Sequence, residues 1–186
     1  MRKLIVFNNI TLDGYFTDAK GDMSWAHKSD PEWHSFIAEN ARGGGELLFG
    51  RVTYDLMASY WPTPFAKERD PQVADRMNAL PKVVFSTTMD QPRWNNTRLV
   101  KTDLLGAVEK MKHEPGQQMV IFGSGTIVSQ LTQAGLIDEF QLVVHPIVLG
   151  SGRSMFEGLE KKLPLKLTKS RVFGNGNVLL HYQPAS

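Results

Sequence analysis

Short apolar runs alternate with stretches of helical periodicity along this chain of 186 residues, and this alternation restricts the possible folds most. The runs are nearly continuous, as is typical of strands that are buried on both faces of a parallel sheet. Between them, apolar residues recur at helical spacing, as Trp33, Phe36 and Ile37 do. Strands that alternate with helices predict an α/β fold, with a mostly parallel central sheet and helices on both faces. The predicted strands of this sheet are residues 3–10, 46–49, 82–85, 99–100, 119–122 and 140–148.

Local signals predict where helices begin. Ser29 or Asp30 can cap a helix that has Pro31 in its first turn. Asp70 precedes a proline that opens a further helix, and Thr102 is the expected cap of the helix that follows it. These caps place helices between the predicted strands, as the α/β alternation requires.

The last part of the chain has a different pattern. Residues 165–173 and 178–182 are predicted to be extended strands, and the segment between them contains the Asn-Gly pair that is typical of a β-hairpin turn. A C-terminal hairpin would add antiparallel strands to one edge of the sheet. We expect one domain that spans residues 1–186.

Composition excludes several classes of function. Hydrophobic residues make up 41% of the chain and charged residues 22%, which is ordinary for a globular domain. The net charge of +2 is too small to indicate a surface that binds nucleic acid. Without cysteine there are no disulfides or thiolate metal sites, and the histidines lack metal-ligand spacing, so no metal is expected. Since no apolar run is long enough for a signal peptide or a membrane span, we expect a cytoplasmic protein without a membrane partner.

Three predicted strands are followed directly by small, hydroxyl-bearing or basic residues, in the segments 49–53, 85–87 and 122–125. The carboxyl ends of parallel strands form the ligand crevice of an open α/β sheet. Gly-Ser-Gly at 123–125 leads from a strand into a helix, whose first N–H groups can bind a phosphate. Arg51 offers a fork of donors that suits a second phosphate, and Thr53 can cap the helix behind it. Each segment alone is better explained as a polar turn or a surface charge, but the three together favour a dinucleotide site.

With these motifs, the chain resembles the dihydrofolate reductase-like superfamily. The order and spacing of the matching motifs cover almost the whole chain. Residues 11–14 and 145–150 look closer to the reductase domain of bacterial riboflavin biosynthesis enzymes, and the best fit is to stand-alone bacterial proteins related to that domain. The matching motifs are Leu12-Asp13-Gly14, residues 50–54, 82–87 and 120–125, and the late strand that enters Gly150-Ser151-Gly152.

The resemblance implies a mixed sheet of about eight strands, bound NADPH and a homodimer. In this family the first turn after the second strand lies near the phosphates, and the glycine turn at 123–126 holds the pyrophosphate. Arg51 and Ser86 would reach the 2′-phosphate, and Asn9 and Ile10 would flank the nicotinamide. The implied cofactor-binding residues are Asn9, Ile10, Gly50, Arg51, Thr53, Ser86, Thr87, Gly123, Ser124, Gly125 and Thr126.

Three carboxylates are candidates for the proton donor. Asp13 matches a residue that lies near the substrate in riboflavin-type reductases, and it equally fits an Asp-Gly turn. Asp30 and Glu32 begin a helix that carries an acid in dihydrofolate reductases, and they equally fit an N-cap and a partner of the helix dipole. The residues expected on the substrate side are Asp13, Trp25, Phe49 and His145, although Trp25 and His145 can equally be packing residues.

The sequence therefore predicts an NADPH-dependent reductase that transfers a hydride to a C=N or C=O bond of a small planar heterocycle, of pterin or aminopyrimidine type. One alternative is the ribosylaminopyrimidine-phosphate reductase of riboflavin biosynthesis, with Lys28, Arg42 and Arg153 as possible phosphate donors. Another is a nucleotide-binding protein without turnover. A nucleic-acid binder is disfavoured by the near-neutral charge.

Overall fold

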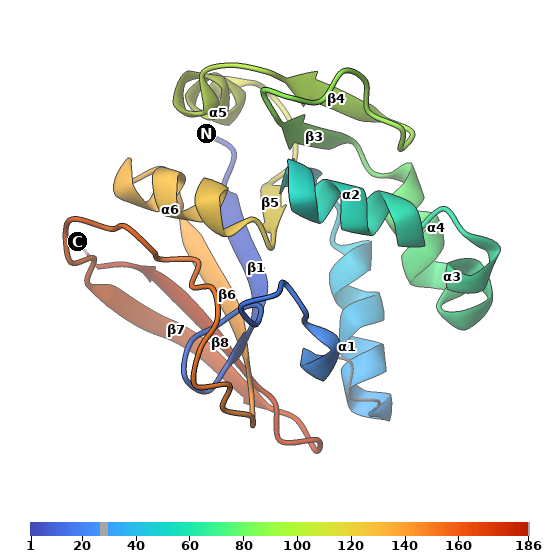
Figure 1. Cartoon of the computed structure of the whole chain (residues 1–186), viewed down its shortest axis with the longest axis vertical. Helices are drawn as coiled ribbons and strands as arrows, with labels where there is room; N and C mark the ends of the chain where they lie inside the picture. The colour runs from blue at the N-terminus through green and yellow to red at the C-terminus, as the bar shows by residue number, and fades with distance from the viewer. Residues whose placement is uncertain (27–29, 186) are drawn as a thin grey trace.

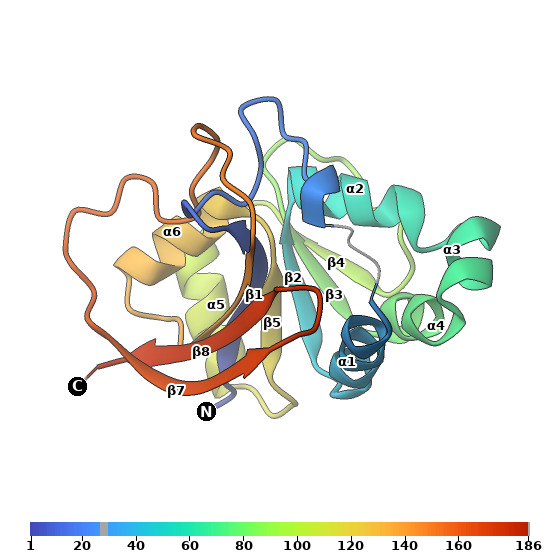
Figure 2. The same cartoon turned by 90° about the horizontal axis from the view of Figure 1, so that it is seen from below.

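The computed structural model describes residues 1–26 and 30–185. Its centre is an eight-stranded sheet in the order β4-β3-β2-β5-β1-β6-β8-β7 (Figures 1 and 2). The first six strands in that order are parallel, and β8 runs antiparallel to β6 and to β7. This confirms the predicted mixed sheet with a C-terminal hairpin. The strands are β1 (Leu4–Thr11), β2 (Glu46–Gly50), β3 (Lys82–Phe85), β4 (Thr97–Val100), β5 (Met119–Phe122), β6 (Glu139–His145), β7 (Leu165–Val172) and β8 (Val178–Pro184).

Helices cover both faces of the sheet, as predicted. Figure 2 shows α5 and α6 on one face and α1 to α4 on the other. The core is divided in the same way, since one buried cluster joins the sheet to α5 and α6 and two others join it to α1, α2 and α4. The helices are the 3₁₀ turn η1 (Ser24–Ala26), α1 (Pro31–Arg42), α2 (Arg51–Tyr60), α3 (Pro64–Arg69), α4 (Pro71–Ala79), α5 (Leu104–His113) and α6 (Gly125–Gln133).

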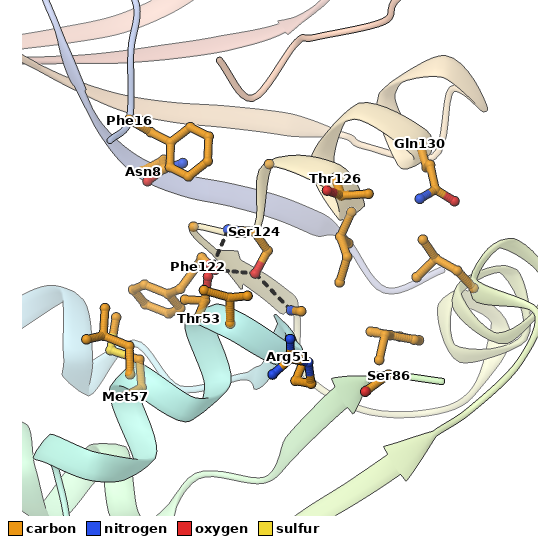
Figure 3. A pocket seen from close by; sticks show the side chains of 18 of the residues that line it. Asn8, Phe16, Arg51, Thr53, Met57, Ser86, Phe122, Ser124, Thr126 and Gln130 are labelled. Atoms are coloured by element: carbon orange, nitrogen blue, oxygen red, sulfur yellow. Dashed lines mark hydrogen bonds between the residues drawn. The ribbon is translucent and has the colours of Figure 1, made fainter. Parts of the chain in front are cut away.

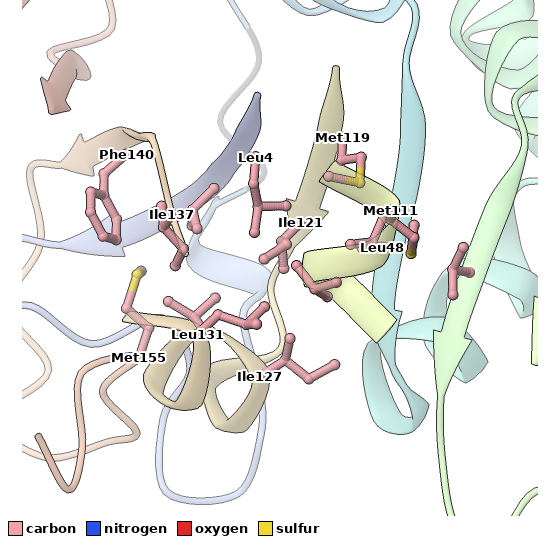
Figure 4. Close-up of a cluster of buried hydrophobic side chains, with 14 of the residues drawn as sticks. Leu4, Leu48, Met111, Met119, Ile121, Ile127, Leu131, Ile137, Phe140 and Met155 are labelled. Atoms are coloured by element: carbon pink, nitrogen blue, oxygen red, sulfur yellow. The ribbon is translucent and has the colours of Figure 1, made fainter. Parts of the chain in front are cut away.

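Strand β2 shows why the central runs are continuously apolar. Leu48 packs into the cluster on the α5 and α6 face, which Figure 4 shows in close-up. Its neighbours Leu47 and Phe49 point the other way, into the cluster with α2 and α4. Because successive side chains of a strand alternate between the faces, a strand covered on both sides needs apolar residues at every position.

Several predicted boundaries can be compared with the structure. Asp30 caps α1, since its Oδ1 accepts a hydrogen bond from the Trp33 N–H at 2.9 Å; the alternative, Ser29, lies outside the described residues. The expected cap Thr102 is wrong. Asp103 caps α5 instead, in the left-handed conformation (φ 52°), and accepts from the Gly106 N–H at 3.0 Å.

The strand expected at 140–148 is shorter at its carboxyl end. Strand β6 ends at His145, because Pro146 has no N–H group to donate to a neighbouring strand. Helix α3, which begins after the Thr63 cap, was not predicted.

Among residues 1–26 and 30–185, no helix combines the length and the apolar character that crossing a membrane requires.

Candidate functional site

A pocket of about 530 Å³ opens at the carboxyl ends of the parallel strands. Its walls come from the ends of β1, β2, β3, β4 and β5, the starts of α2, α5 and α6, and the loop after β1 (Figure 3). The structure therefore brings the three predicted strand-end segments to one place. The predicted cofactor residues that line the pocket are Asn9, Gly50, Arg51, Thr53, Ser86, Thr87, Gly123, Ser124, Gly125 and Thr126.

Of the helix N-termini that border this pocket, those of α2 and α6 carry predicted cofactor residues. Helix α2 begins at Arg51, and α6 begins at Gly125. In α6 the N–H groups of Ile127 and Val128 donate to the Ser124 carbonyl, at 2.9 and 3.0 Å. Within the described part of the chain this leaves the N–H groups of Gly125 and Thr126 without an acceptor. Such N–H groups, together with the positive end of the helix dipole, bind anions.

Ser124 connects the two helix starts. Its Oγ accepts a hydrogen bond from the Gly50 N–H at 2.8 Å and donates to the Phe122 carbonyl at 3.1 Å. Its own N–H donates to Thr53 Oγ1 at 3.1 Å (dashed lines in Figure 3). Thr53 was expected to cap α2, and this is wrong, since Gly50 is the N-cap and Thr53 lies inside the helix. Both hydroxyls are therefore occupied in holding the α2 and α6 starts together.

This connection requires an unusual backbone at the turn. Gly123 and Ser124 both have positive φ, 56° and 61°. A Cβ on Gly123 would lie 3.0 Å from Thr53 Oγ1, so a glycine is needed for the close approach of the turn to α2. Ser124 adopts the left-handed region without being a glycine, and its three hydrogen bonds compensate for that strain.

The end of the pocket at β3 and β4 is rich in hydrogen-bond donors. The Arg51 side chain is 51% exposed, and its nearest carboxylate is Asp55 at 3.5 Å, one helical turn away. The hydroxyl-bearing residues 86–88 follow β3, and Lys101 follows β4. Lys101 was not predicted, although it follows a strand end as the three recognised segments do. The donor set at this end fits a phosphate monoester.

The opposite end of the pocket lies at β1. Asn8 and Asn9 both line it, together with Phe16 and Met23 from the loop that follows β1. Asn9 is held in place, because its Oδ1 lies 2.9 Å from His145 Nε2. Asn8 is 3% exposed, and its Nδ2 is buried without a hydrogen-bond partner. An unpaired buried amide in a pocket wall fits a bound ligand.

Several residues predicted for this end do not line the pocket. Ile10 packs against the core cluster of α5 and α6. Phe49 is fully buried in the cluster with α2 and α4. His145 is also fully buried, and its ring meets the edge of Trp25 at 5.2 Å between centroids. The structure thus places Ile10, Phe49 and His145 in the core behind the pocket, and Trp25 beside His145.

The three candidate carboxylates lie outside the pocket lining. The Thr11 hydroxyl donates to Asp13 at 2.6 Å, and together with the N–H groups of Gly150 and Leu149 it lowers the pKa of the Asp13 carboxyl. Asp13 is therefore an ionised acceptor at neutral pH that ties the turn after β1 to the loop after β6. A carboxylate with a lowered pKa is poorly suited to donate a proton.

Asp30 and Glu32 serve the structure of α1 and its surroundings. Asp30 is its N-cap, and Glu32 accepts from Arg171 at 2.9 Å and from the Gly174 N–H at 3.4 Å. Of the described residues that line the pocket, Asp103 alone carries a carboxylate, and it caps α5 at the opposite end. No cluster of three or more potential metal ligands occurs among residues 1–26 and 30–185.

The match to a known family covers nearly the whole chain. Residues 2–179 match the family described as the RibD C-terminal domain. The Bacillus subtilis (strain 168) protein that is named "Uncharacterized protein YyaP" is 28% identical over 97% of this chain and 94% of its own length.

Solved structures are similar over the full length. A Shewanella sp. PV-4 protein, provisionally named for riboflavin biosynthesis, has a TM-score of 0.75 at 25% identity, with 99% of each chain covered. Dihydrofolate reductase from Enterococcus faecalis has a TM-score of 0.65 at 14% identity, over 99% of this chain and 97% of that one. The second similarity shows that the fold is that of dihydrofolate reductase.

Proposed function

Because this chain belongs to the RibD C-terminal domain family, a reductase-domain family with the dihydrofolate reductase fold, we propose that it is an NADPH-dependent reductase. Its substrate is a small planar heterocycle of pterin or aminopyrimidine type, reduced at a C=N or C=O bond. The observation that carries the proposal is the convergence of the α2 and α6 N-termini on one pocket beside Arg51. When bound there, NADPH supplies the hydride.

Each part of the pocket has its role in this proposal. The N–H groups of Gly125 and Thr126 bind the pyrophosphate, and Arg51 with Ser86 binds the 2′-phosphate. Ser124 and Thr53 hold the two helix starts in register. The protein binds and orients the cofactor.

The proton has a different source from the three candidate carboxylates. Asp13, Asp30 and Glu32 are each committed to hydrogen bonds away from the pocket lining. We therefore assign the proton to a water molecule that reaches the substrate through the pocket mouth. This predicts a rate that shows no titration of a carboxylic acid between pH 5 and 8.

The first experiment is a titration of the purified protein with NADPH and with NADH, followed by tryptophan fluorescence. Binding that favours NADPH supports the site. Absence of binding of either nucleotide would remove the proposed function, because Gly123-Ser124-Gly125 would then be only a turn.

Arg51→Ala tests the 2′-phosphate site directly. The variant should bind NADPH at least about ten-fold more weakly, as expected for a charge-assisted hydrogen bond, and should bind NADH almost as the wild type does. Arg93→Ala, which changes an exposed arginine outside the pocket, is the control. Equal losses for both nucleotides would show that Arg51 does not contact the 2′-phosphate.

A second candidate function is the reduction of a ribosylaminopyrimidine phosphate. Arg153 favours it, since this side chain lines the pocket with its guanidinium 6.0 Å from the Phe16 ring centre. Lys28 and the Arg42 side chain, the other expected phosphate donors, lie outside the described residues. If this is the reaction, Arg153→Ala raises KM for the phosphorylated substrate and leaves KM for the unphosphorylated nucleoside unchanged.

A third candidate is nucleotide binding without turnover. It is favoured by the absence of a carboxylate from the described pocket lining around β1. NADPH binding without NADPH oxidation across a panel of dihydropterins and aminopyrimidines would support this candidate over the reductase.

A further inference from the structure

Asn8 is a polar residue at a position where the strand pattern requires an apolar one. Val6 and Leu4, two and four positions earlier on β1, point to the same face and are buried in the cluster of α5 and α6. The Asn8 carboxamide is buried to 97%, since only 3% of the residue is exposed, and its Nδ2 has no hydrogen-bond partner. Figure 3 shows it in the wall of the pocket beside Phe16.

The side-chain amide of the neighbouring residue, Asn9, does have a hydrogen-bond partner. Asn9 points to the opposite face and pairs with His145. Among residues 1–26 and 30–185 the Asn8 Nδ2 has no such partner, and a buried amide group without one destabilises the folded state. Because Asn8 lines the pocket, a ligand bound there can supply the missing partner.

The sheet order indicates which part of the ligand reaches Asn8. Strands β3, β2, β5 and β1 are consecutive neighbours, so their ends form a row about 14 Å long, with Ser86 at one end and Asn8 at the other. Arg51 follows β2, and the α6 N-terminus follows β5. A dinucleotide whose 2′-phosphate is held at Arg51 and whose pyrophosphate is held at α6 has its nicotinamide at β1.

We propose that Asn8 positions the nicotinamide, with its Nδ2 donating to the oxygen of the ring carboxamide. This assignment rests on the proposed function. A primary amide is both donor and acceptor, so the Asn8 and nicotinamide carboxamides are complementary. The pairing satisfies Nδ2 only when the ligand is bound, which makes Asn8 a determinant of affinity rather than of folding.

The test measures affinities for NADPH and for 2′-phospho-ADP-ribose, which has the same phosphates but no nicotinamide. Asn8→Leu nearly preserves the side-chain volume, and Asn8→Ala cannot obstruct the pocket. Both variants should bind NADPH about ten-fold more weakly, the effect of one hydrogen bond, and should bind 2′-phospho-ADP-ribose as the wild type does. Asn8→Leu should also melt at the same or a higher temperature without ligand, which a structural asparagine would not allow.

Asn175 offers a matched control. Its Nδ2 is also buried without a partner, but it lies in the loop between β7 and β8, outside the pocket. Asn175→Ala should leave both affinities unchanged. Equal weakening of both ligands in the Asn8 variants would place Asn8 at a phosphate, and unchanged NADPH affinity would make it structural; either result overturns the assignment. If the wild type binds neither nucleotide, the proposed function fails as well, so the two failures are distinguishable.

Discussion

At the scale of single residues, the polar groups around the pocket divide into those that hydrogen-bond the protein and those that remain available. The hydroxyls of Thr53 and Ser124 belong to the first group, and so does the Asp13 carboxylate. Among the described residues, the N–H groups of Gly125 and Thr126 and the Asn8 Nδ2 belong to the second. The Arg51 guanidinium is half exposed and has further donors besides the one that contacts Asp55 at 3.5 Å. A residue can therefore matter for ligand binding without contacting the ligand.

Thr53 provides a test of such an indirect role. Thr53→Val keeps the shape of the side chain and removes the acceptor for the Ser124 N–H, which is then left buried and unpaired. The expected loss is about 1–2 kcal/mol in the free energy of unfolding, together with several-fold weaker NADPH binding. Thr53→Ser keeps the oxygen and should restore both. The measurements are urea unfolding and nucleotide titration; equal behaviour of the two variants would contradict the role of the hydroxyl.

Asp13 predicts a pH dependence of stability. Its pKa is lowered in the folded state, chiefly by the Thr11 hydroxyl, so the folded protein binds the proton less readily than the unfolded chain. The stabilisation is fully present above the unfolded pKa of about 3.9 and is lost as the pH falls through the folded value. Asp13→Asn should thus melt below the wild type at pH 7, and the gap should close below about pH 4. A gap that persisted at low pH would exclude this linkage.

At the scale of elements, the acidic residue at the start of α1 is compatible with two roles, proton donor and helix cap. A carboxylate at this position fits a proton donor and a helix cap equally well in the sequence. In the structure the Asp30 carboxylate accepts from Trp33 N–H, and the pocket lining does not include it.

The two roles of Asp30 predict different outcomes. Asp30→Ala should lower the free energy of unfolding by about 1 kcal/mol, and Asp30→Asn, which also caps well, should not. Neither variant should change NADPH affinity or turnover at saturating substrate. Loss of turnover in Asp30→Asn with stability retained would instead identify Asp30 as the proton donor. Thermal unfolding and steady-state rates separate the cases.

At the scale of the whole molecule, the sheet has an exposed edge. Strand β7 is the last strand in the sheet order, and two of its apolar side chains are exposed, Leu167 at 49% and Val172 at 70%. An edge strand presents unpaired backbone groups that can pair with another chain.

We therefore expect the homodimer implied by the family resemblance to involve β7. Sedimentation equilibrium should give twice the mass of 20.9 kDa, and a charge at Val172, as in Val172→Lys, should shift the protein toward the monomer. Lys166→Glu, on the same strand, controls for a change of charge alone. A wild-type monomer at micromolar concentration would contradict the expectation.

The sequence by itself determined the α/β class, the C-terminal hairpin and the gathering of residues near 50, 86 and 124 at one edge. Each of these follows from short-range rules. Alternating periodicities specify strands and helices, Asn-Gly specifies the turn, and the carboxyl ends of parallel strands meet at one edge wherever each strand stands in the sheet.

Only the tertiary structure decided what each side chain does there. Thr53 pairs with Ser124 across 71 positions, and Asp13 pairs with Leu149 across 136. The sequence pattern likewise did not predict the caps at Asp103 and Gly50, the bonding of Asp13 outside the pocket lining or the buried, unpaired Nδ2 of Asn8. Periodicity specifies which face of an element is buried, whereas these partners depend on the order and register of the strands, which arise from packing of the whole chain.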